Sequence, residues 1–372
     1  MVVSSITVEK PRTAEELANT LREAADAGKA VAPVGGGRAS EMGGVLERCD
    51  VELHTSGLDR VIEHAPADMV VTVEAGITLE ALQAHLAKSG QFLPLDPFGS
   101  PGHTIGGLLA TGWTGPLRFR YGSPRDFLIG IRVALPDGKL ASAGGRVVKN
   151  VSGYDMMKLQ YGALGSLGVI VAASLKVFPR PLSDVTVMTD HTDVRDAWTD
   201  AERVLALPML PAALEVYSNG GVAARFLGSP DAVRATVASL GWDGGYNEIW
   251  ADHAKASPND HARRLPNTFA RIAVPRNSFR STMETLGPDA YWYGSPGLGI
   301  AQWEVEGSAA DIRAARAAAE RAGGSLVLIA APDEVKHEVG AWGTPPPTLD
   351  LMRRLKDAFD PHHVLNPGRF VV

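Results

Sequence analysis

The residues of this chain that are best suited to chemistry are glycines gathered in three loops. The first loop, residues 33–40, contains Gly35, Gly36 and Gly37 followed by Arg38, and the other two loops span 101–112 and 148–170. Because glycine has no Cβ and adopts positive φ readily, such loops let backbone N–H groups approach a diphosphate closely. For any single loop the alternative is an ordinary glycine turn. We therefore treat the three loops as candidate phosphate-binding segments.

Glycine is also frequent in the chain as a whole, and the common nucleotide motifs do not account for it. There are 40 glycines among 372 residues, about 11% against a usual share of about 7%, without the G-X-Y period of collagen. The first loop runs into Glu41-Met42-Gly43-Gly44 rather than into the G-x-G-x-x-G of a Rossmann helix. The sequence has no P-loop, no H-E-x-x-H zinc helix and no G-x-S-x-G elbow. These patterns disfavour a Rossmann-type site.

The overall composition excludes several classes of partner. Lys and Arg number 36 against 42 Asp and Glu, so the net charge is −6 and there is no basic surface for nucleic acid. The single cysteine, Cys49, excludes internal disulfides and clusters of thiolate ligands. No apolar run approaches the roughly 18 residues of a membrane span. We expect a cytoplasmic protein without direct membrane insertion, which could be peripheral to the inner membrane through partners.

Alternating helices and strands must position the glycine loops. Thr13 and Glu16 form a capping box that begins a helix over about 13–27, and the apolar run 30–34 predicts a strand that leads into the first loop. A strand at 69–74, a helix that begins after Thr78, and strands near 133–135 and 168–177 are expected around the other two loops.

The length of 372 residues predicts about two domains, since single cores stop growing near roughly 250–300 residues. We place the boundary at Pro179-Arg180-Pro181, so that residues 1–181 form the first domain. Residues 182–344 form a smaller α+β domain, with Trp292 and Trp303 in its core. The prolines at 345–347 then lead into a final segment, 345–372, which contains a helix. The fold class is α+β.

Four motifs, in their order along the chain, resemble those of a known family. They are the first glycine loop; Pro101-Gly102-His103-Thr104-Ile105-Gly106-Gly107; Lys149-Asn150 with Gly153-Tyr154-Asp155; and Leu365-Asn366-Pro367-Gly368-Arg369. The chain resembles the PCMH-type FAD-binding domain of the vanillyl-alcohol oxidase superfamily, which has two subdomains. Gly112-Trp113-Thr114-Gly115-Pro116 and residues 122–127 narrow the resemblance to the E-type FAD-binding subunit of bacterial glycolate oxidase. The resemblance implies a cap domain at 182–344, with 345–372 returning to the FAD domain.

The resemblance also assigns residues to the parts of FAD. It places Gly35, Gly36, Gly37, Arg38 and Ala39 at the pyrophosphate, and Thr104, Ile105, Gly106 and Gly107 against the diphosphate and flavin as backbone donors. It places Asn150, Gly153 and Tyr154 by the flavin, Gly168, Val169 and Ile170 by the adenine, and Asn366 over the site. Many relatives attach flavin through a histidine in the first loop, which this loop lacks, so we expect noncovalent FAD. Cys49 is interpreted as a buried filler residue.

Candidates for catalysis are weaker than those for the cofactor. Hydride removal from the α-carbon of a hydroxy acid needs a base for the hydroxyl proton and a cation for the carboxylate. His103 is the candidate base, and Arg118, in a loop shared with Arg120 and Arg125, is the candidate cation. The alternatives are a hydrogen-bonded loop histidine and a solvated or partner-facing basic loop. His362 and His363 could lie near the flavin, or they could stabilise the C-terminal end of a helix through its dipole.

Two hypotheses for function remain open. Catalytic relatives usually carry a late His-rich metal motif, whereas residues 291–299 contain no histidine, so no metal site is predicted. In the first hypothesis FAD takes hydride from glycolate or a similar small 2-hydroxy acid, and electrons pass to an iron–sulfur subunit. In the second, this chain is a non-catalytic flavin-bearing electron-transfer or assembly subunit. The resemblance implies a larger FAD-binding subunit and an iron–sulfur subunit as partners in both. A reductase that uses a nicotinamide donor is a more remote alternative.

Overall fold

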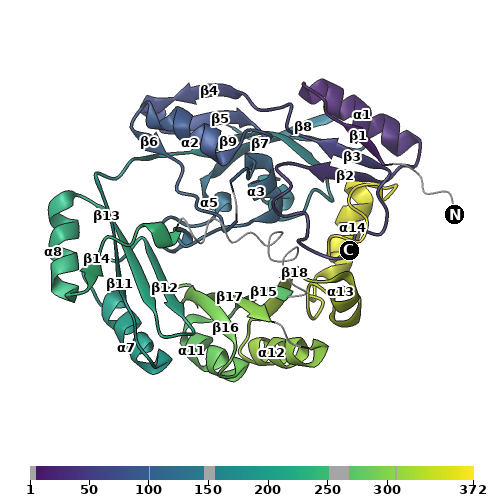
Figure 1. Cartoon of the computed structure of the whole chain (residues 1–372). Coiled ribbons are helices and arrows are strands. Elements are labelled where there is room, and N and C mark those ends of the chain that lie inside the picture. The colour runs from purple at the N-terminus through teal and green to yellow at the C-terminus, as the bar shows by residue number, and fades with distance from the viewer. Residues whose placement is uncertain (1–5, 100, 146–155, 251–267, 306–307) are drawn as a thin grey trace.

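The N-terminal half of the protein contains a small parallel sheet that carries the first glycine loop. The computed structural model describes residues 6–99, 101–145, 156–250, 268–305 and 308–372. Strands β1 (Thr7–Glu9), β3 (Val51–His54) and β2 (Val31–Val34) pair in the order β1-β3-β2, all parallel. Helix α1 (Ala14–Asp26) contacts β3, and the first glycine loop begins where β2 ends (Figure 1).

The helix predicted over about 13–27 is confirmed as α1, which is one residue shorter at each end. Thr13 caps it, since its hydroxyl accepts the N–H of Glu16 at 3.0 Å. Leu17 and Leu21 are fully buried on the face that packs against the sheet. The helix ends before Gly28, whose φ of +63° is the left-handed conformation that glycine adopts without strain.

A five-stranded antiparallel sheet forms the second part of this half. Its order is β4 (Val61–Ala65), β5 (Val70–Glu74), β9 (Val169–Lys176), β7 (Leu128–Ala134) and β8 (Leu140–Gly144). The 3-10 helix η1 (Pro66–Asp68) links β4 to β5, and short helices follow along the chain: α2 (Leu79–Ala87), α3 (Ile105–Thr111), α4 (Arg118–Tyr121), α5 (Pro124–Phe127) and α6 (Met157–Gln160). Strand β6 (Gln91–Phe92) pairs with β10 (Phe178–Pro179) just before residue 181. The strands expected at 69–74, 133–135 and 168–177 are therefore present.

The following residues build one eight-stranded sheet whose neighbours are antiparallel. Its order is β14 (Asp243–Gly244), β11 (Ser183–Thr189), β13 (Val222–Gly228), β12 (Ala213–Tyr217), β16 (Tyr291–Ser295), β17 (Ile300–Val305), β15 (Thr268–Ala273) and β18 (Ser325–Ala330). Helices α7 (Val194–Leu205), α8 (Pro230–Leu240), α11 (Phe279–Met283) and α12 (Ala309–Arg321) lie on the face away from the N-terminal half (Figure 1). Trp292 and Trp303 are 4% and 3% exposed, so their predicted place in the core is confirmed.

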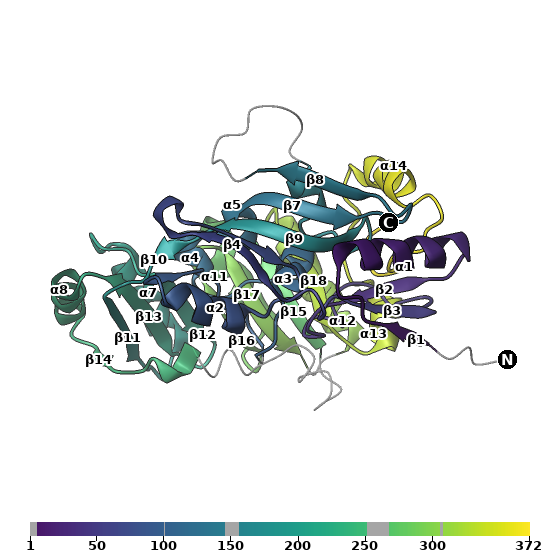
Figure 2. The ribbon, with the colours of Figure 1, turned by 90° about the horizontal axis from the view of Figure 1, so that it is seen from above.

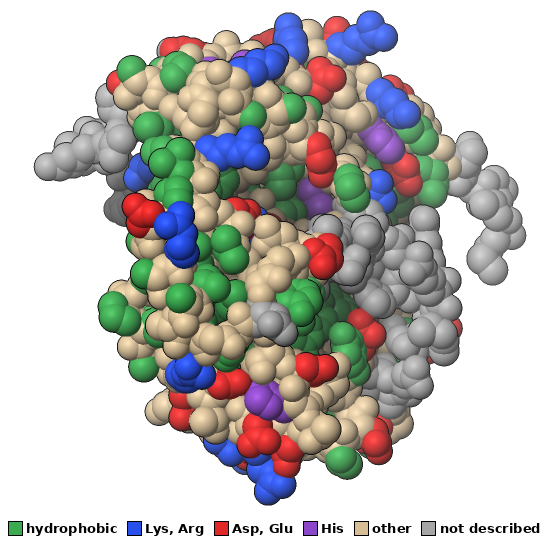
Figure 3. Space-filling model, turned by 60° about the vertical axis from the view of Figure 1, so that its left-hand side comes forward, with side chains coloured by type: hydrophobic (Ala, Val, Ile, Leu, Met, Phe, Trp, Pro, Cys, Tyr) green, Lys and Arg blue, Asp and Glu red, His purple; other side chains and the backbone are tan. Residues whose placement is uncertain are grey.

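The other face of this large sheet meets the N-terminal half through aromatic side chains. The ring of Phe98 lies edge-on to that of Tyr293 with centroids 5.5 Å apart, and Trp113 contacts Phe269 in the same way. On the face shown in Figure 3, hydrophobic side chains gather around a hollow near the middle of the molecule. No described helix is long and apolar enough to cross a membrane. The proposed division at residues 181 and 344 stays a prediction, although β11 begins the large sheet at Ser183.

The C-terminal segment lies against the N-terminal half. The chain continues through η2 (Arg276–Ser278), η3 (Glu284–Leu286), α13 (Asp333–Val339) and α14 (Leu349–Phe359). The C-terminus lies near the β1-β3-β2 sheet in both ribbon views (Figure 1, Figure 2). The backbone N–H of Val31 donates to Val364 O at 2.7 Å, and that of Asn366 donates to Val31 O at 2.9 Å. The chain end is thereby joined to β2, directly before the first glycine loop.

Candidate functional site

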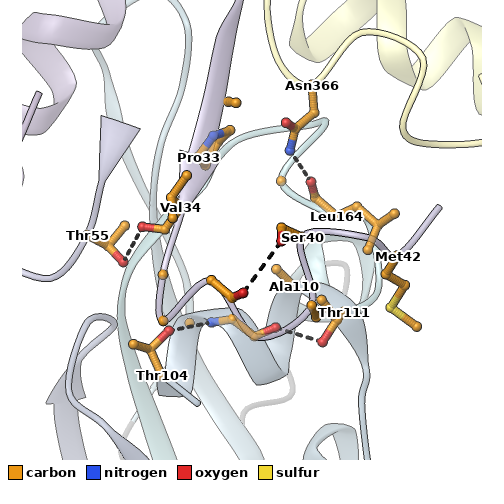
Figure 4. A pocket seen from close by; sticks show the side chains of 18 of the residues that line it. Pro33, Val34, Ser40, Met42, Thr55, Thr104, Ala110, Thr111, Leu164 and Asn366 are labelled. Carbon is orange, nitrogen blue, oxygen red and sulfur yellow. Dashed lines mark hydrogen bonds between the residues drawn. The ribbon is translucent and has the colours of Figure 1, made fainter. Parts of the chain in front are cut away.

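A cavity of about 270 Å³ lies where the first glycine loop, α3 and the C-terminal segment meet (Figure 4). This is close to the lower end of the roughly 300–1,000 Å³ of small-molecule sites. The predicted cofactor residues that line it are Gly35, Gly36, Gly37, Arg38, Ala39, Thr104, Gly106, Gly107, Val169, Ile170 and Asn366. The structure therefore brings together residues from the three glycine loops and the C-terminal segment. Asn150, Gly153 and Tyr154 lie outside the described residues.

The first loop combines tight packing with free backbone donors. A Cβ on Gly36 would overlap the carbonyl oxygen of Gly102, so this glycine lets two loops touch. Gly37 has φ +65° and no atom within 4 Å of where its Cβ would be. The backbone N–H groups of Gly35, Gly36, Arg38 and Ala39 donate to no other described residue. Successive free N–H groups of this kind form a concave site for an anion.

Arg38 adds a cation to the same loop. It lines the cavity, and its Nε is buried without a hydrogen-bond partner among the described residues. A buried unpaired donor is costly unless a ligand satisfies it. The free N–H groups and this Nε together fit the two phosphates of a dinucleotide.

The second loop contributes less than the sequence predicted. The N–H of Ile105 donates to Ile77 O at 3.0 Å, and that of Gly106 donates to Ala75 O at 2.7 Å. Thr104 caps α3 by accepting the N–H of Gly107 at 3.2 Å. The expectation that Ile105, Gly106 and Gly107 act as backbone donors to a diphosphate is therefore wrong, because all three N–H groups already donate within the protein. Ile105 is 1% exposed and belongs to the core rather than to the cavity wall.

At the third loop, only two of the three described candidates reach the cavity. Val169 and Ile170 line it, whereas Gly168 does not. A Cβ on Gly168 would lie 2.5 Å from Val133 Cγ1, so this glycine serves the packing of β9 against β7. The structure corrects the expected contact of Gly168 with adenine in this way.

The C-terminal segment closes one side of the cavity. The Nδ2 of Asn366 donates to Leu164 O at 2.6 Å, and its backbone has φ +45° (Figure 4). Arg369 also lines the cavity and donates to Gly44 O at 3.2 Å; burial lowers its pKa. Asparagine tolerates the left-handed conformation better than most residues. Asn366 and Arg369 are thus held at the cavity by backbone contacts that local sequence does not reveal.

Sequence reasoning assigned no role to several other cavity residues, although some of them, such as Ser40, Gly165 and Arg369, lie inside the glycine loops and motifs. Further lining residues are Ser40, Met42, Leu46, Cys49, Glu52, Thr55, Ala110, Thr111, Leu164, Gly165 and Arg369. Cys49 is partly exposed at the cavity, so its interpretation as buried filler is wrong. Burial raises the pKa of its thiol, which therefore stays protonated at neutral pH.

His103 lies between the cavity and the large sheet. It lines the cavity, is 6% exposed, and its Nε2–H donates to Phe98 O at 3.2 Å. The indole Nε1 of Trp113 donates to the same carbonyl at 2.6 Å. Burial lowers the pKa of His103 to about 4, so the ring is neutral at pH 7. A histidine in this state is a weak base, which favours a positioning role over the predicted catalytic one.

The predicted arginine loop divides into residues with different surroundings. Arg118, at the start of α4, lines a second, smaller cavity that faces the large sheet. Arg120 Nη1 donates to Leu227 O at 2.6 Å and so joins α4 to β13. Arg125 is exposed. His362 and His363 are exposed as well, and Nε2 of His363 lies 2.9 Å from Oδ1 of Asp357 in α14, which fits the helix-end alternative.

Comparison with known proteins identifies the family. Residues 6–144 match the family model described as FAD binding domain, and residues 336–370 match that of the C-terminal domain of FAD linked oxidases. Glycolate oxidase subunit GlcE of Escherichia coli (strain K12) is 30% identical over 322 residues, which cover 86% of each chain. The chain belongs to the FAD-linked oxidase family. The predicted resemblance is confirmed.

Other relatives of this FAD-linked oxidase support the same assignment. Glycolate oxidase subunit GlcD of Bacillus subtilis (strain 168) is 24% identical over 412 residues, covering 96% of this chain and 87% of that one. A solved structure of alkyldihydroxyacetonephosphate synthase superimposes with a TM-score of 0.69 at 16% identity, covering 98% of this chain and 77% of the other. The predicted α+β, PCMH-type fold is confirmed, and FAD is the cofactor.

The cavity of this FAD-linked oxidase fits its cofactor on structural grounds too. The free N–H groups of the first loop and the unpaired Nε of Arg38 match a diphosphate. Apolar groups at the same cavity, such as those of Val169, Ile170 and Met42, suit the flat rings of a dinucleotide. Among the described residues, no group of three or more His, Cys, Asp or Glu side chains is arranged to hold a metal ion.

Proposed function

We propose that this chain is an FAD-dependent oxidoreductase subunit that oxidises a small 2-hydroxy acid such as glycolate. The observation that carries the proposal is the set of unused N–H groups at Gly35, Gly36, Arg38 and Ala39, beside the unpaired Arg38 Nε. Similarity to two glycolate oxidase subunits supports the substrate class. When bound, FAD accepts the hydride of the α-carbon.

Within this proposal, the chain's own residues bind and orient. The first loop and Arg38 hold the diphosphate, while Asn366 and Arg369 close the cavity from the chain end. His103, neutral and hydrogen-bonded to Phe98 O, fixes the backbone between the two cavities. We propose noncovalent FAD, because the first loop contains no histidine.

The proposed setting is a hetero-oligomeric, cytoplasmic complex. The partners are a larger FAD-binding subunit and an iron–sulfur subunit that receives the electrons, with attachment to the inner membrane, if any, through those partners. The second candidate function is that of a non-catalytic flavin-bearing electron-transfer or assembly subunit. It is favoured by residues 291–299, which contain none of the histidines that the family resemblance leads us to expect in a catalytic subunit.

Anaerobic bleaching of the flavin separates the two candidates. We expect glycolate or D-lactate to bleach the flavin absorbance of the purified chain, and acetate, which lacks the hydroxyl, to leave it unchanged. Bleaching only after the larger subunit is added would reject autonomous catalysis in favour of the second candidate. A chain that takes up no FAD at all would reject both.

A further inference from the structure

Two histidines meet on the N-terminal half, outside both cavities. His64 belongs to β4 and His85 to the last turn of α2, and Nε2 of His85 lies 3.2 Å from Nδ1 of His64. Both side chains are partly exposed, so solutes can reach them. Neither residue lines the cofactor cavity or the second, smaller cavity. The cofactor site and the proposed function therefore leave this pair of histidines unexplained.

A buried glutamine fixes where His64 carries its proton. Gln91 is 4% exposed, and its amide Nε2 donates to Pro66 O at 2.8 Å and to Met69 Sδ at 3.0 Å. Because a carbonyl oxygen can only accept, the amide oxygen of Gln91 is the atom that faces His64. That oxygen lies 2.8 Å from Nε2 of His64, which therefore carries a proton. In the neutral ring, Nδ1 of His64 then directs a lone pair toward His85.

The two facing ring nitrogens share one proton. Since Nδ1 of His64 has a lone pair, Nε2 of His85 is the donor in this contact. The separation of 3.2 Å is long for a hydrogen bond, because N–H donors usually lie about 2.7–3.2 Å from their acceptors. The ring centroids are 5.1 Å apart, which is closer than they would be if both nitrogens pointed straight at each other. At least one ring is therefore inclined to the line that joins the nitrogens, and the hydrogen bond is a weak one.

The same separation suits two ligands of one metal ion. A histidine nitrogen lies about 2.0–2.1 Å from Zn²⁺, so two such nitrogens are about 3.3–3.4 Å apart at a tetrahedral angle and about 2.8–3.0 Å apart at a right angle. The observed 3.2 Å lies between these values. Gln91 adds a second feature of metal sites, because a ligating histidine usually donates its other N–H to an oxygen that fixes the ring.

The charge on His85 also permits a metal ion. Burial, followed by the nearby charges of His64 and Lys88, lowers the pKa of His85, so its ring is uncharged at pH 7. Lys88 is exposed, and water weakens its repulsion of a second cation. An uncharged imidazole is the form that binds a metal. His85 is therefore in the binding form at neutral pH.

We propose that Nδ1 of His64 and Nε2 of His85 together bind one divalent transition-metal ion, such as Zn²⁺, Ni²⁺ or Cu²⁺. Imidazole nitrogens favour these ions over Mg²⁺ and Ca²⁺, which prefer oxygen ligands. The described residues offer no group of three or more His, Cys, Asp or Glu side chains for a metal, so water completes the coordination.

The ion takes the place of the proton that the two rings share. On binding, the proton of His85 moves from Nε2 to Nδ1, which has no hydrogen-bond partner among the residues that the structure describes. The neutral pair therefore releases no proton. His64 keeps its proton on Nε2, where Gln91 accepts it.

A metal ion at this place joins β4 to the C-terminal end of α2. The other end of α2 contacts the second loop, since the N–H of Leu79 donates to His103 O at 2.8 Å and Glu80 Oε1 accepts the N–H of Gly102 at 3.3 Å. The ion itself does not line the cofactor cavity, so we expect it to stabilise the fold rather than to take part in flavin chemistry. The inference is independent of the proposed function.

Calorimetric titration with Zn²⁺ tests the site in the full chain, purified with FAD and freed of metals with EDTA. We expect His64→Gln and His85→Gln each to lose one Zn²⁺ site of the parent, or to raise its Kd by at least about ten- to a hundredfold, the cost of losing even an outer partner of a ligand. His337→Gln is the matched control, because His337 is an exposed histidine in the last turn of α13. It should bind Zn²⁺ as the parent does. Zn²⁺ binding that is the same in the parent and both variants would overturn the proposal.

Thermal unfolding provides a second measurement. Zn²⁺ should raise the Tm of the parent and of His337→Gln, and it should raise the Tm of His64→Gln and His85→Gln less or not at all. An equal rise in all four proteins, or an equal rise with Mg²⁺, would reject the site. Normal flavin bleaching without histidine-dependent Zn²⁺ binding would reject this site and leave the proposed function standing. Histidine-dependent Zn²⁺ binding by a chain whose flavin never bleaches would do the opposite.

Discussion

Arg38 is the residue through which the cofactor cavity can be tested most directly. Its side chain lines the cavity, and its buried Nε has no partner among the described residues. A side chain that makes no internal bond contributes little to folding, so its replacement should affect ligand binding more than stability.

We therefore expect Arg38→Met to weaken FAD binding about ten- to a hundredfold, the loss of about 1.5–3 kcal/mol for a charged hydrogen bond. Fluorescence titration of the FAD-free chain measures this. ADP should lose affinity by the same factor because it shares the diphosphate, whereas riboflavin should not. The control is Arg22→Met, an exposed residue of α1. An equal loss for riboflavin, or none for FAD, would contradict a role at the diphosphate.

Residue types and spacing predicted much of the cofactor cavity and little of the second, smaller cavity. The glycines of the first loop are recognisable because their requirement is local: Gly37 needs positive φ, and Gly36 needs a close backbone contact. The sequence could not show that the N–H of Ile105 is already hydrogen-bonded, because its acceptor, Ile77 O, lies in another loop. Arg271 carries no motif. It lines the second cavity together with Arg118, which lies far from it in the sequence.

At the scale of elements, α14 fixes the C-terminal side of the cavity through a buried ion pair. Lys356 and Asp360 are 3% and 0% exposed, and their side chains are 2.6 Å apart. Lys356 Nζ also donates to Ser166 O and Leu365 O, and Asp360 accepts the N–H groups of Val364 and Leu365. Asn366 follows directly, so the pair positions a residue of the cavity.

Removing one partner of such a pair leaves the other charge buried and uncompensated. We expect Lys356→Met to lower the free energy of unfolding by about 3–5 kcal/mol in urea titrations and to weaken FAD binding. Combining it with Asp360→Asn should restore part of the stability, because the unpaired charge is then removed too. Arg354→Met, on the exposed side of the same helix, is the matched control. A Lys356→Met variant as stable as this control would contradict the structural role.

Most elements were predictable from local patterns, and their pairing was not. The apolar period and the Thr13 cap were enough for α1, and alternation was enough for β5 and β9. The joining of β2 to the chain end, through Val31 and Leu365, depends on residues more than three hundred positions apart. No local signal encodes such contacts, so the C-terminal return had to come from the family resemblance.

At the scale of the whole molecule, carboxyl groups are buried where the two halves meet. Asp96 belongs to the N-terminal half, where its two oxygens accept the N–H of Leu117 at 3.1 and 3.0 Å. Glu215 belongs to the large sheet, and burial raises its pKa well above the usual value. Burial raises the pKa of Asp96 from 3.8 to about 7. The junction between the halves therefore favours the protonated form of both groups.

This raised pKa predicts how stability depends on pH. A carboxyl whose folded pKa lies above its unfolded value binds more protons when folded, so its stabilising contribution is complete below pH 3.8 and is lost as the pH rises through about 7. A shift of this size corresponds to a loss of about 4 kcal/mol.

Asp96→Asn cannot ionise and keeps an oxygen to accept the N–H of Leu117. The free energy of unfolding of Asp96→Asn, relative to that of the parent, should therefore increase between pH 5 and pH 8. Urea titrations at the two pH values measure the difference, with the exposed Asp231→Asn as control. A difference that does not change with pH would show that Asp96 is already charged at pH 5, and the two halves would then meet around a carboxylate rather than a neutral acid.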